Sequence, residues 1–206
     1  MTVLVYAEHN NHQLKAETHK LVNAAAKMGD DIHVLVAGSN CADVATEASQ
    51  IEGVTQVLVA DNAVYEHQLA ENIAELVHSM AGDYSHVVAA ATTTGKNFMP
   101  RVAALLDVVQ LSDVIAVEGA DTFVRPIYAG NAIATVQSSD SIKVITVRAS
   151  AFDAAATGNN APVSTVDSVF ANNLSEFVSE EVTKSDRPEL TAANIIISGG
   201  RGMHCL

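Results

Sequence analysis

Six consecutive residues near the middle of the chain have side chains that suit an anion site. Thr92 to Asn97 (TTTGKN) combine hydroxyls, a glycine and a lysine at the predicted start of a helix, and a helix N-terminus favours negative charge. The spacing is not that of a P-loop, because the pattern Gly-x4-Gly-Lys-[Ser/Thr] is missing. A helix N-cap with a tight turn and an exposed lysine explains the same residues and is preferred. The candidate anion-loop residues are Thr94, Gly95, Lys96 and Asn97.

A glycine-rich turn near the C-terminal end is a second candidate. Residues 198–202 (SGGRG) follow Asn194–Ile197, an apolar run that reads as a strand. A strand followed by a glycine-rich turn opens many nucleotide-binding units. The guanidinium of Arg201 could stack beside, or hydrogen-bond to, a flavin or a phosphate. Arg201 is therefore a candidate cofactor-binding residue, and an exposed chain end is the alternative.

No residue pattern in the chain predicts a catalytic or metal site. The N-terminal histidines, among them His9 and His12, lack metal-ligand spacing and are expected at the surface. Cys41 begins a short helix without a visible partner base and is expected to be a small buried residue. Arg125, next to Pro126, indicates a strand edge or bulge and an ion-pair donor for an interface.

The overall composition excludes several classes of partner. The formal net charge of −13 disfavours nucleic acid. No apolar stretch reaches the roughly 18 residues that span a bilayer, so the chain is not expected to be membrane-embedded. Two cysteines in 206 residues and a first strand directly after Met1, with no leader pattern, favour a reducing, cytoplasmic compartment.

The candidate sites depend on alternating strands and helices in the first half of the chain. Apolar periodicity predicts strands at 2–7, 32–37, 56–60 and 86–91, and helices at 14–28, 41–51, 69–80 and 98–106. Pro100 is placed in the first turn of the last helix. This alternation predicts an α/β fold with a mostly parallel sheet. Ligands are expected at the loops after the strands, at 8–11, 38–40 and 92–95.

The second half changes pattern and gives the domain division. Strand-like runs at 114–118, 122–129, 132–137 and 142–148 predict an added antiparallel meander, with Gly130-Asn131 as a two-residue hairpin turn. A small-residue loop at 151–162 precedes two further candidate strands, 163–169 and 177–183. The polar connector 184–188 marks the boundary. We expect an N-terminal α/β domain at 1–187 and the first strand and glycine turn of another domain at 188–206.

Several long segments resemble one known family. The segments are "ATTTGKNFMPRVAALLDV" at 91–108, "RPIYAGNAIATVQSSD" at 125–140 and "KSDRPELTAANIIISGGRGM" at 184–203, with shorter ones such as "AEHNN" at 7–11. Together they resemble the alpha subunits of electron transfer flavoproteins, over residues 2–203. The resemblance implies a three-layer αβα, Rossmann-like domain of the adenine-nucleotide-hydrolase type.

The resemblance also implies a function. In that family the first domain packs against a beta subunit, and a second domain binds FAD. The heterodimer is an electron carrier, not an enzyme. It takes electrons from acyl-CoA dehydrogenases of fatty acid beta-oxidation and from other dehydrogenases, and it passes them to a membrane-bound quinone oxidoreductase. The location implied is the bacterial cytoplasm, or the mitochondrial matrix if a leader has been removed.

The sequence departs from the family pattern after Met203, where it ends in His204-Cys205-Leu206. The expectation is a truncated chain that keeps the docking domain and, of the FAD contacts, only Arg201. It is expected to bind no cofactor alone and to self-associate through the unpaired strand at 192–197. Two alternatives stay open: a free-standing adenine-nucleotide-binding module that uses Thr94–Asn97, and a fragment without function.

Overall fold

Alternating strands and helices build the first half of the chain, as the periodicity predicts. The computed structural model describes residues 1–181, 190, 193, 195–200 and 202. The elements run β1 (Thr2–Tyr6), α1 (Glu17–Ala25), β2 (Asp31–Gly38), α2 (Ala42–Ser49), β3 (Gln56–Asp61), α3 (Ala70–Ala81), β4 (His86–Ala90) and α4 (Thr93–Leu106). Short 3-10 turns at Ala63–Tyr65, Tyr128–Gly130 and Ala149–Ala151 complete the connections.

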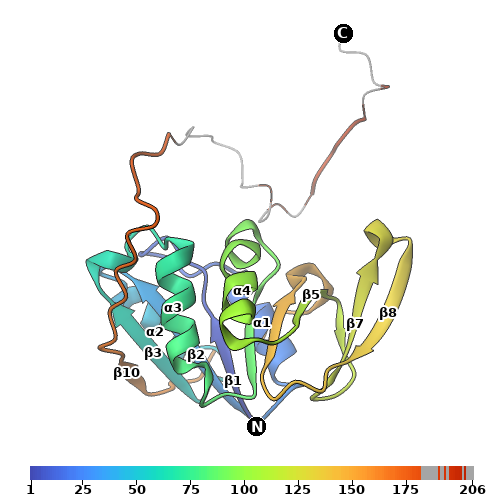
Figure 1. Ribbon diagram of the computed structural model, residues 1–206, viewed down its shortest axis with the longest axis horizontal. Coiled ribbons are helices and arrows are strands. Elements are labelled where there is room, and N and C mark those ends of the chain that lie inside the picture. The colour runs from blue at the N-terminus through green and yellow to red at the C-terminus, as the bar shows by residue number, and fades with distance from the viewer. Residues whose placement is uncertain (182–189, 191–192, 194, 201, 203–206) are drawn as a thin grey trace.

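A seven-stranded sheet forms the middle layer, in the order β10-β3-β2-β1-β4-β9-β5, and every pair in it is parallel. It includes β5 (Gln110–Val114), β9 (Lys143–Val147) and β10 (Val163–Thr165). Successive side chains of a strand point to opposite faces. Val3 and Val5 accordingly pack with residues of α1 and α2, whereas Leu4 and Tyr6 pack with α3 and α4. Figure 1 shows the resulting three-layer arrangement, which confirms the predicted fold class.

A small antiparallel sheet leaves the body as an arm (Figure 1). It contains β6 (Ala116–Val117), β7 (Thr122–Ile127) and β8 (Ala132–Gln137), in that order. The hairpin is confirmed, but its loop has four residues rather than two, because Ile127 pairs with Ala132. Tyr128, Ala129 and Gly130 in that loop all have positive φ.

The run at 142–148 does not belong to the meander, and this part of the prediction is wrong. It forms β9, which lies between β4 and β5 in the main sheet and is parallel to both. Val144, Ile145 and Val147 are fully buried. Continuous apolar runs of this kind are typical of a parallel strand covered on both faces, which explains the difference.

Helix α4 begins earlier than predicted. Thr92 is its N-cap, with a side chain that accepts a hydrogen bond from the amide of Gly95, so the helix starts at Thr93 rather than Phe98. Pro100 therefore lies inside the helix and not in its first turn. The predicted loop at Thr94–Asn97 is the first part of this helix.

The remaining expectations concern the end of the chain. Strand β10 covers only the start of the run expected at 163–169. A strand was expected at 177–183, but its described part, 177–181, is not in a strand. Another was expected at 192–197, and its described residues, 193 and 195–197, are not in a strand either. The proposed domain connector, 184–188, lies outside the described residues. Among the residues described, no helix is both long and apolar enough to cross a bilayer.

Candidate functional site

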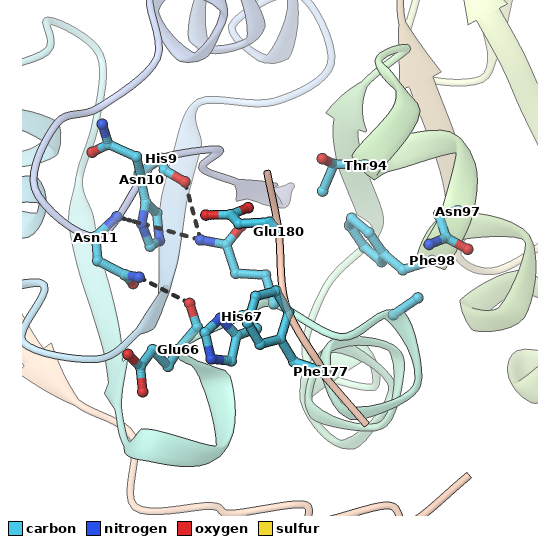
Figure 2. A pocket seen from close by; sticks show the side chains of 12 residues that line it. His9, Asn10, Asn11, Glu66, His67, Thr94, Asn97, Phe98, Phe177 and Glu180 are labelled. Atoms are coloured by element: carbon cyan, nitrogen blue, oxygen red, sulfur yellow. Dashed lines mark hydrogen bonds between the residues drawn. The ribbon is translucent and has the colours of Figure 1, made fainter. Parts of the chain in front are cut away.

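The order of the strands creates a crevice at the carboxyl ends of β1 and β4. The chain passes from β1 through β2 to β3 in one direction and then returns to place β4 on the other side of β1. Open α/β sheets bind ligands at such switch points. A pocket of about 440 Å³ opens there. Figure 2 shows its walls, which are formed by His9, Asn10, Asn11, Glu66, His67, Gln68, Ala70, Thr94, Asn97, Phe98, Phe177 and Glu180.

One wall is held in place by Asn11, which joins three loops. Its Oδ1 accepts a hydrogen bond from the amide of Ser39 at 3.1 Å, and its Nδ2 donates to the carbonyl of Glu66 at 2.9 Å. Asn11 has φ of 68°, in the left-handed region that asparagine tolerates better than most residues. Of the loops expected at the site, Asn11 thus joins those after β1 and β2, and it adds the loop after β3 (Figure 2). The expected loop after β4 reaches the pocket through Thr94.

His9 belongs to the same wall and is a buried neutral imidazole. It is 5% exposed, and burial lowers its pKa to about 4. Its Nδ1 accepts from the amide of Asn11 at 3.0 Å and lies 3.3 Å from Nε2 of Gln68. The neutral ring therefore carries its proton on Nε2. The expectation of a surface histidine is wrong for His9, because the turn after β1 directs the ring inward against Gly38.

The opposite wall begins at the N-terminus of α4, where a carboxylate of the chain itself is present. The hydroxyl of Thr92 donates to Glu8, which is 3% exposed, and also accepts from the amide of Gly95. Burial raises the pKa of Glu8, although the Thr92 hydrogen bond opposes the shift. A helix N-terminus attracts one negative group, and here Glu8 supplies it.

The four predicted anion-loop residues are divided by the helix. Thr94 and Asn97 line the pocket, whereas Lys96 is exposed and does not. A Cβ at Gly95 would collide with the carbonyl oxygen of Ala90, so this glycine allows close packing of α4 on β4. No lysine or arginine is found among the described lining residues, which include two carboxylates, Glu66 and Glu180. The pocket therefore suits a neutral or cationic group better than a phosphate.

Residues 166–181, which we call the strap, cross α3 and reach the mouth of the pocket. The amide of Phe170 donates to the hydroxyl of Tyr65 at 3.1 Å, and the amide of Asn172 donates to Oδ1 of Asn72 at 2.9 Å. At the pocket, Phe177 stacks on His67 with ring centroids 3.7 Å apart (Figure 2). These contacts join segments about 100 residues apart, and nothing in the local sequence pattern indicates them.

The other candidate residues have structural surroundings. Cys41 is buried, and burial raises the pKa of its thiol to about 11, as expected for an unreactive residue. Asp113 forms an ion pair with Arg148. Across the described ranges, no cluster of three histidine, cysteine or acidic side chains could hold a metal. Arg201 lies outside the described residues.

Comparison with known proteins gives a consistent set of relatives. The model of the electron transfer flavoprotein domain matches residues 3–170. The chain is 61% identical to electron transfer flavoprotein subunit alpha of Pseudomonas aeruginosa over 204 residues, and 52% identical to that of Paracoccus denitrificans over 203. Both alignments cover 98% of this chain and 66% of the relative. The mitochondrial alpha subunit of Dictyostelium discoideum is 47% identical, with 98% and 62% covered.

The family match extends over the sheet, the arm and the start of the strap, and the alignment with the Pseudomonas aeruginosa relative covers 98% of the chain. The chain spans about two thirds of the length of the curated relatives it matches. The expected resemblance is thereby confirmed. The chain belongs to the electron transfer flavoprotein family.

Proposed function

We propose that this chain acts as the beta-subunit-docking part of an electron transfer flavoprotein alpha subunit. The observation that carries the proposal is the 61% identity, over 98% of the chain, to a protein named as that subunit. Relatives with this name are carriers of electrons rather than catalysts. The surroundings of Cys41 agree with a scaffold role, because burial raises the pKa of its thiol to about 11 and leaves it unsuited to nucleophilic work.

The proposed complex is a heterodimer with a beta subunit. It would accept electrons from acyl-CoA and other dehydrogenases and pass them to a quinone oxidoreductase. The bacterial relatives suggest the cytoplasm as its location, and the mitochondrial relatives suggest the matrix.

The described residues do not fit FAD. The pyrophosphate of a dinucleotide carries negative charge, whereas the described lining of the pocket includes two carboxylates and no lysine or arginine. At the glycine turn, Gly200 has no heavy atom within 4 Å of an added Cβ, so no wall surrounds it in the described part. We therefore propose that the docking domain contributes no flavin site of its own.

The same residues count against the adenine-nucleotide module. A phosphate at the start of α4 would meet the buried carboxylate of Glu8 and would lack Lys96, which is exposed and does not line the pocket. Like charges at such short range are strongly unfavourable.

The test is to mix the purified chain with the beta subunit of its source organism and to measure mass by light scattering after gel filtration. A one-to-one complex supports docking. Isothermal titration with AMP, ATP and FAD provides the comparison. Tight binding of an adenine nucleotide to the chain alone, with no affinity for the beta subunit, would replace the proposal with the nucleotide-binding module.

A further inference from the structure

The pocket at the switch point has one wall whose polar groups are already engaged. Asn11 uses both ends of its amide to join neighbouring loops. Oδ1 of Asn10 accepts from two backbone amides of its own turn, and Nε2 of Gln68 donates to the carbonyl of His9 at 3.1 Å. This wall is therefore fixed by the chain's own hydrogen bonds, and it contributes mainly shape to the pocket.

The rest of the pocket carries polar groups that are not engaged. Within the described ranges, five lining side chains make no hydrogen bond and no ion pair: Glu66, His67, Thr94, Asn97 and Glu180. They come from the loop after β3, from the start of α4 and from the strap (Figure 2). A few polar groups that converge on one cavity from separate segments are typical of a small-molecule site.

The charge of these groups favours a cation. Glu66 and Glu180 are carboxylates, which only accept hydrogen bonds when ionised, and the described lining residues include no lysine or arginine. The net charge of −13 adds to the attraction for cations. A bare metal ion is not favoured, because no cluster of three potential ligands is found among the described residues. The pocket volume of about 440 Å³ is that of a site for an organic ligand.

The aromatic part of the lining favours a flat cation. Phe177 stacks on His67 with ring centroids 3.7 Å apart and an angle of 10° between the planes. A guanidinium group stacks on aromatic rings and also binds a carboxylate through two parallel hydrogen bonds, whereas an ammonium group is a compact point charge. The oxygens of Thr94 and Asn97 can accept hydrogen bonds from a second donor group of the same ligand.

We propose that this pocket binds a small organic cation that carries a guanidinium group, held by the carboxylates of Glu66 and Glu180 beside the His67–Phe177 pair. Phe177 and Glu180 belong to the strap, so the site is complete only when the strap lies in place. A ligand that binds only the complete site stabilises it, and the strap therefore closes one side of the pocket. The site lies at the carboxyl edge of the main sheet and does not depend on the proposed docking to a beta subunit.

The experiment is an NMR titration of the isotope-labelled full chain with agmatine, a butylammonium that carries a guanidinium group. Putrescine, with an ammonium in place of that group, is the matched comparison. We expect agmatine to shift the resonances of the pocket and to bind at least about threefold more tightly than putrescine. Equal affinity for the two amines, or shifts confined to other parts of the chain, would overturn the inference.

Three variants separate a site from general attraction to an acidic protein. Glu66→Gln and Glu180→Gln should each weaken agmatine binding at least about threefold, as expected for a partly exposed ion pair. Glu176→Gln makes the same change of charge on the strap but outside the pocket lining, and it should leave the Kd unchanged. If all three variants weaken binding equally, the attraction is general and the proposed site is wrong.

Two further measurements test the strap and the source of the guanidinium group. Saturating agmatine should slow hydrogen exchange of the amides at 172–180, and unchanged exchange with agmatine bound would show that the strap is not part of the site. A short arginine peptide with blocked ends carries the same group. If that peptide binds more tightly than agmatine, the pocket receives a protein side chain and the small-molecule assignment is overturned.

Discussion

The hydroxyl of Thr92 donates to the buried carboxylate of Glu8 and so joins the start of α4 to the carboxyl end of β1. The two residues follow β1 and β4, the strands on either side of the switch point, and are 84 positions apart. Because the same hydroxyl caps the helix through Gly95, the helix start and the carboxylate form one unit. The position that other α/β proteins use for phosphate is in this way already neutralised.

Glu8→Gln should gain stability relative to the wild type as the pH rises. Burial raises the pKa of Glu8 in the folded state. Protonated Glu8 therefore stabilises the folded state below a pH of about 4.3, which is the pKa in the unfolded chain. This stabilisation is lost as the pH rises through the folded-state pKa. Urea unfolding at pH 4 and pH 7 measures the difference. Glu71→Gln is the control with the opposite sign, because a hydrogen bond from Ser175 lowers the pKa of Glu71. A constant difference for Glu8→Gln across that range would contradict the prediction.

Because of His9, the free energy of unfolding should fall as the pH is lowered. Its pKa is about 4 in the folded state against about 6.5 unfolded, so the unfolded chain binds the extra proton between these values. Stability should fall by roughly 3 kcal/mol as the pH drops from 6.5 to 4. His9→Asn can keep the acceptor for the Asn11 amide and should flatten this dependence. Urea denaturation from pH 7 to pH 4 measures it, and an equal slope in both proteins would show that His9 is not responsible.

Gly95→Ala should be strongly destabilising, since its Cβ would strike the carbonyl oxygen of Ala90. Moving α4 away from β4 to make room should cost more than about 2 kcal/mol. Lys96→Ala, one residue later and exposed, should change the free energy of unfolding by less than about 0.5 kcal/mol. Chemical denaturation separates the two. Similar losses in both variants would show that the packing argument is wrong.

Phe177→Ala should loosen the end of the strap without unfolding the domain. The substitution removes the stack of Phe177 on His67. Because Phe177 is 39% exposed and lies outside the core, only the local stability of the strap should fall. Amides between residues 172 and 180 should exchange faster, while those of β4 stay protected. Phe177→Tyr keeps the stack and serves as the control. Unchanged exchange in Phe177→Ala would mean that the hydrogen bonds at Asn172 and Ser175 hold the strap alone.

Local patterns were sufficient to predict the central layers. The runs that became β1 to β4 are apolar and short, and each is followed by a helical period, so the sheet and its flanking helices could be anticipated. β9 was assigned to the wrong sheet because an apolar run does not say which neighbour it will pair with. The helix N-cap expected within Thr92–Asn97 is confirmed at Thr92, but the apolar period alone placed the first helical residue at Phe98 rather than Thr93.

Only part of the pocket lining could be predicted from the sequence. The loops at 8–11 and 92–95 could be expected at the carboxyl edge because every parallel strand ends there. His67 and Phe177 could not, since their stacking depends on how the strap crosses α3. The burial of His9 was missed for the same reason, because it follows from the turn made by Asn11.

The arm is an excursion between two strands of the main sheet, since the chain leaves at β5 and returns at β9 as its direct neighbour. It is anchored at its base by Phe123, which is fully buried, and by the 2.6 Å contact between His86 and the carbonyl of Ala120. Everything beyond Phe123 can therefore lengthen, shorten or change its residues without redirecting the strands of the core. Relatives of this fold can therefore differ in the hairpin beyond Phe123 and keep the same strand order in the main sheet.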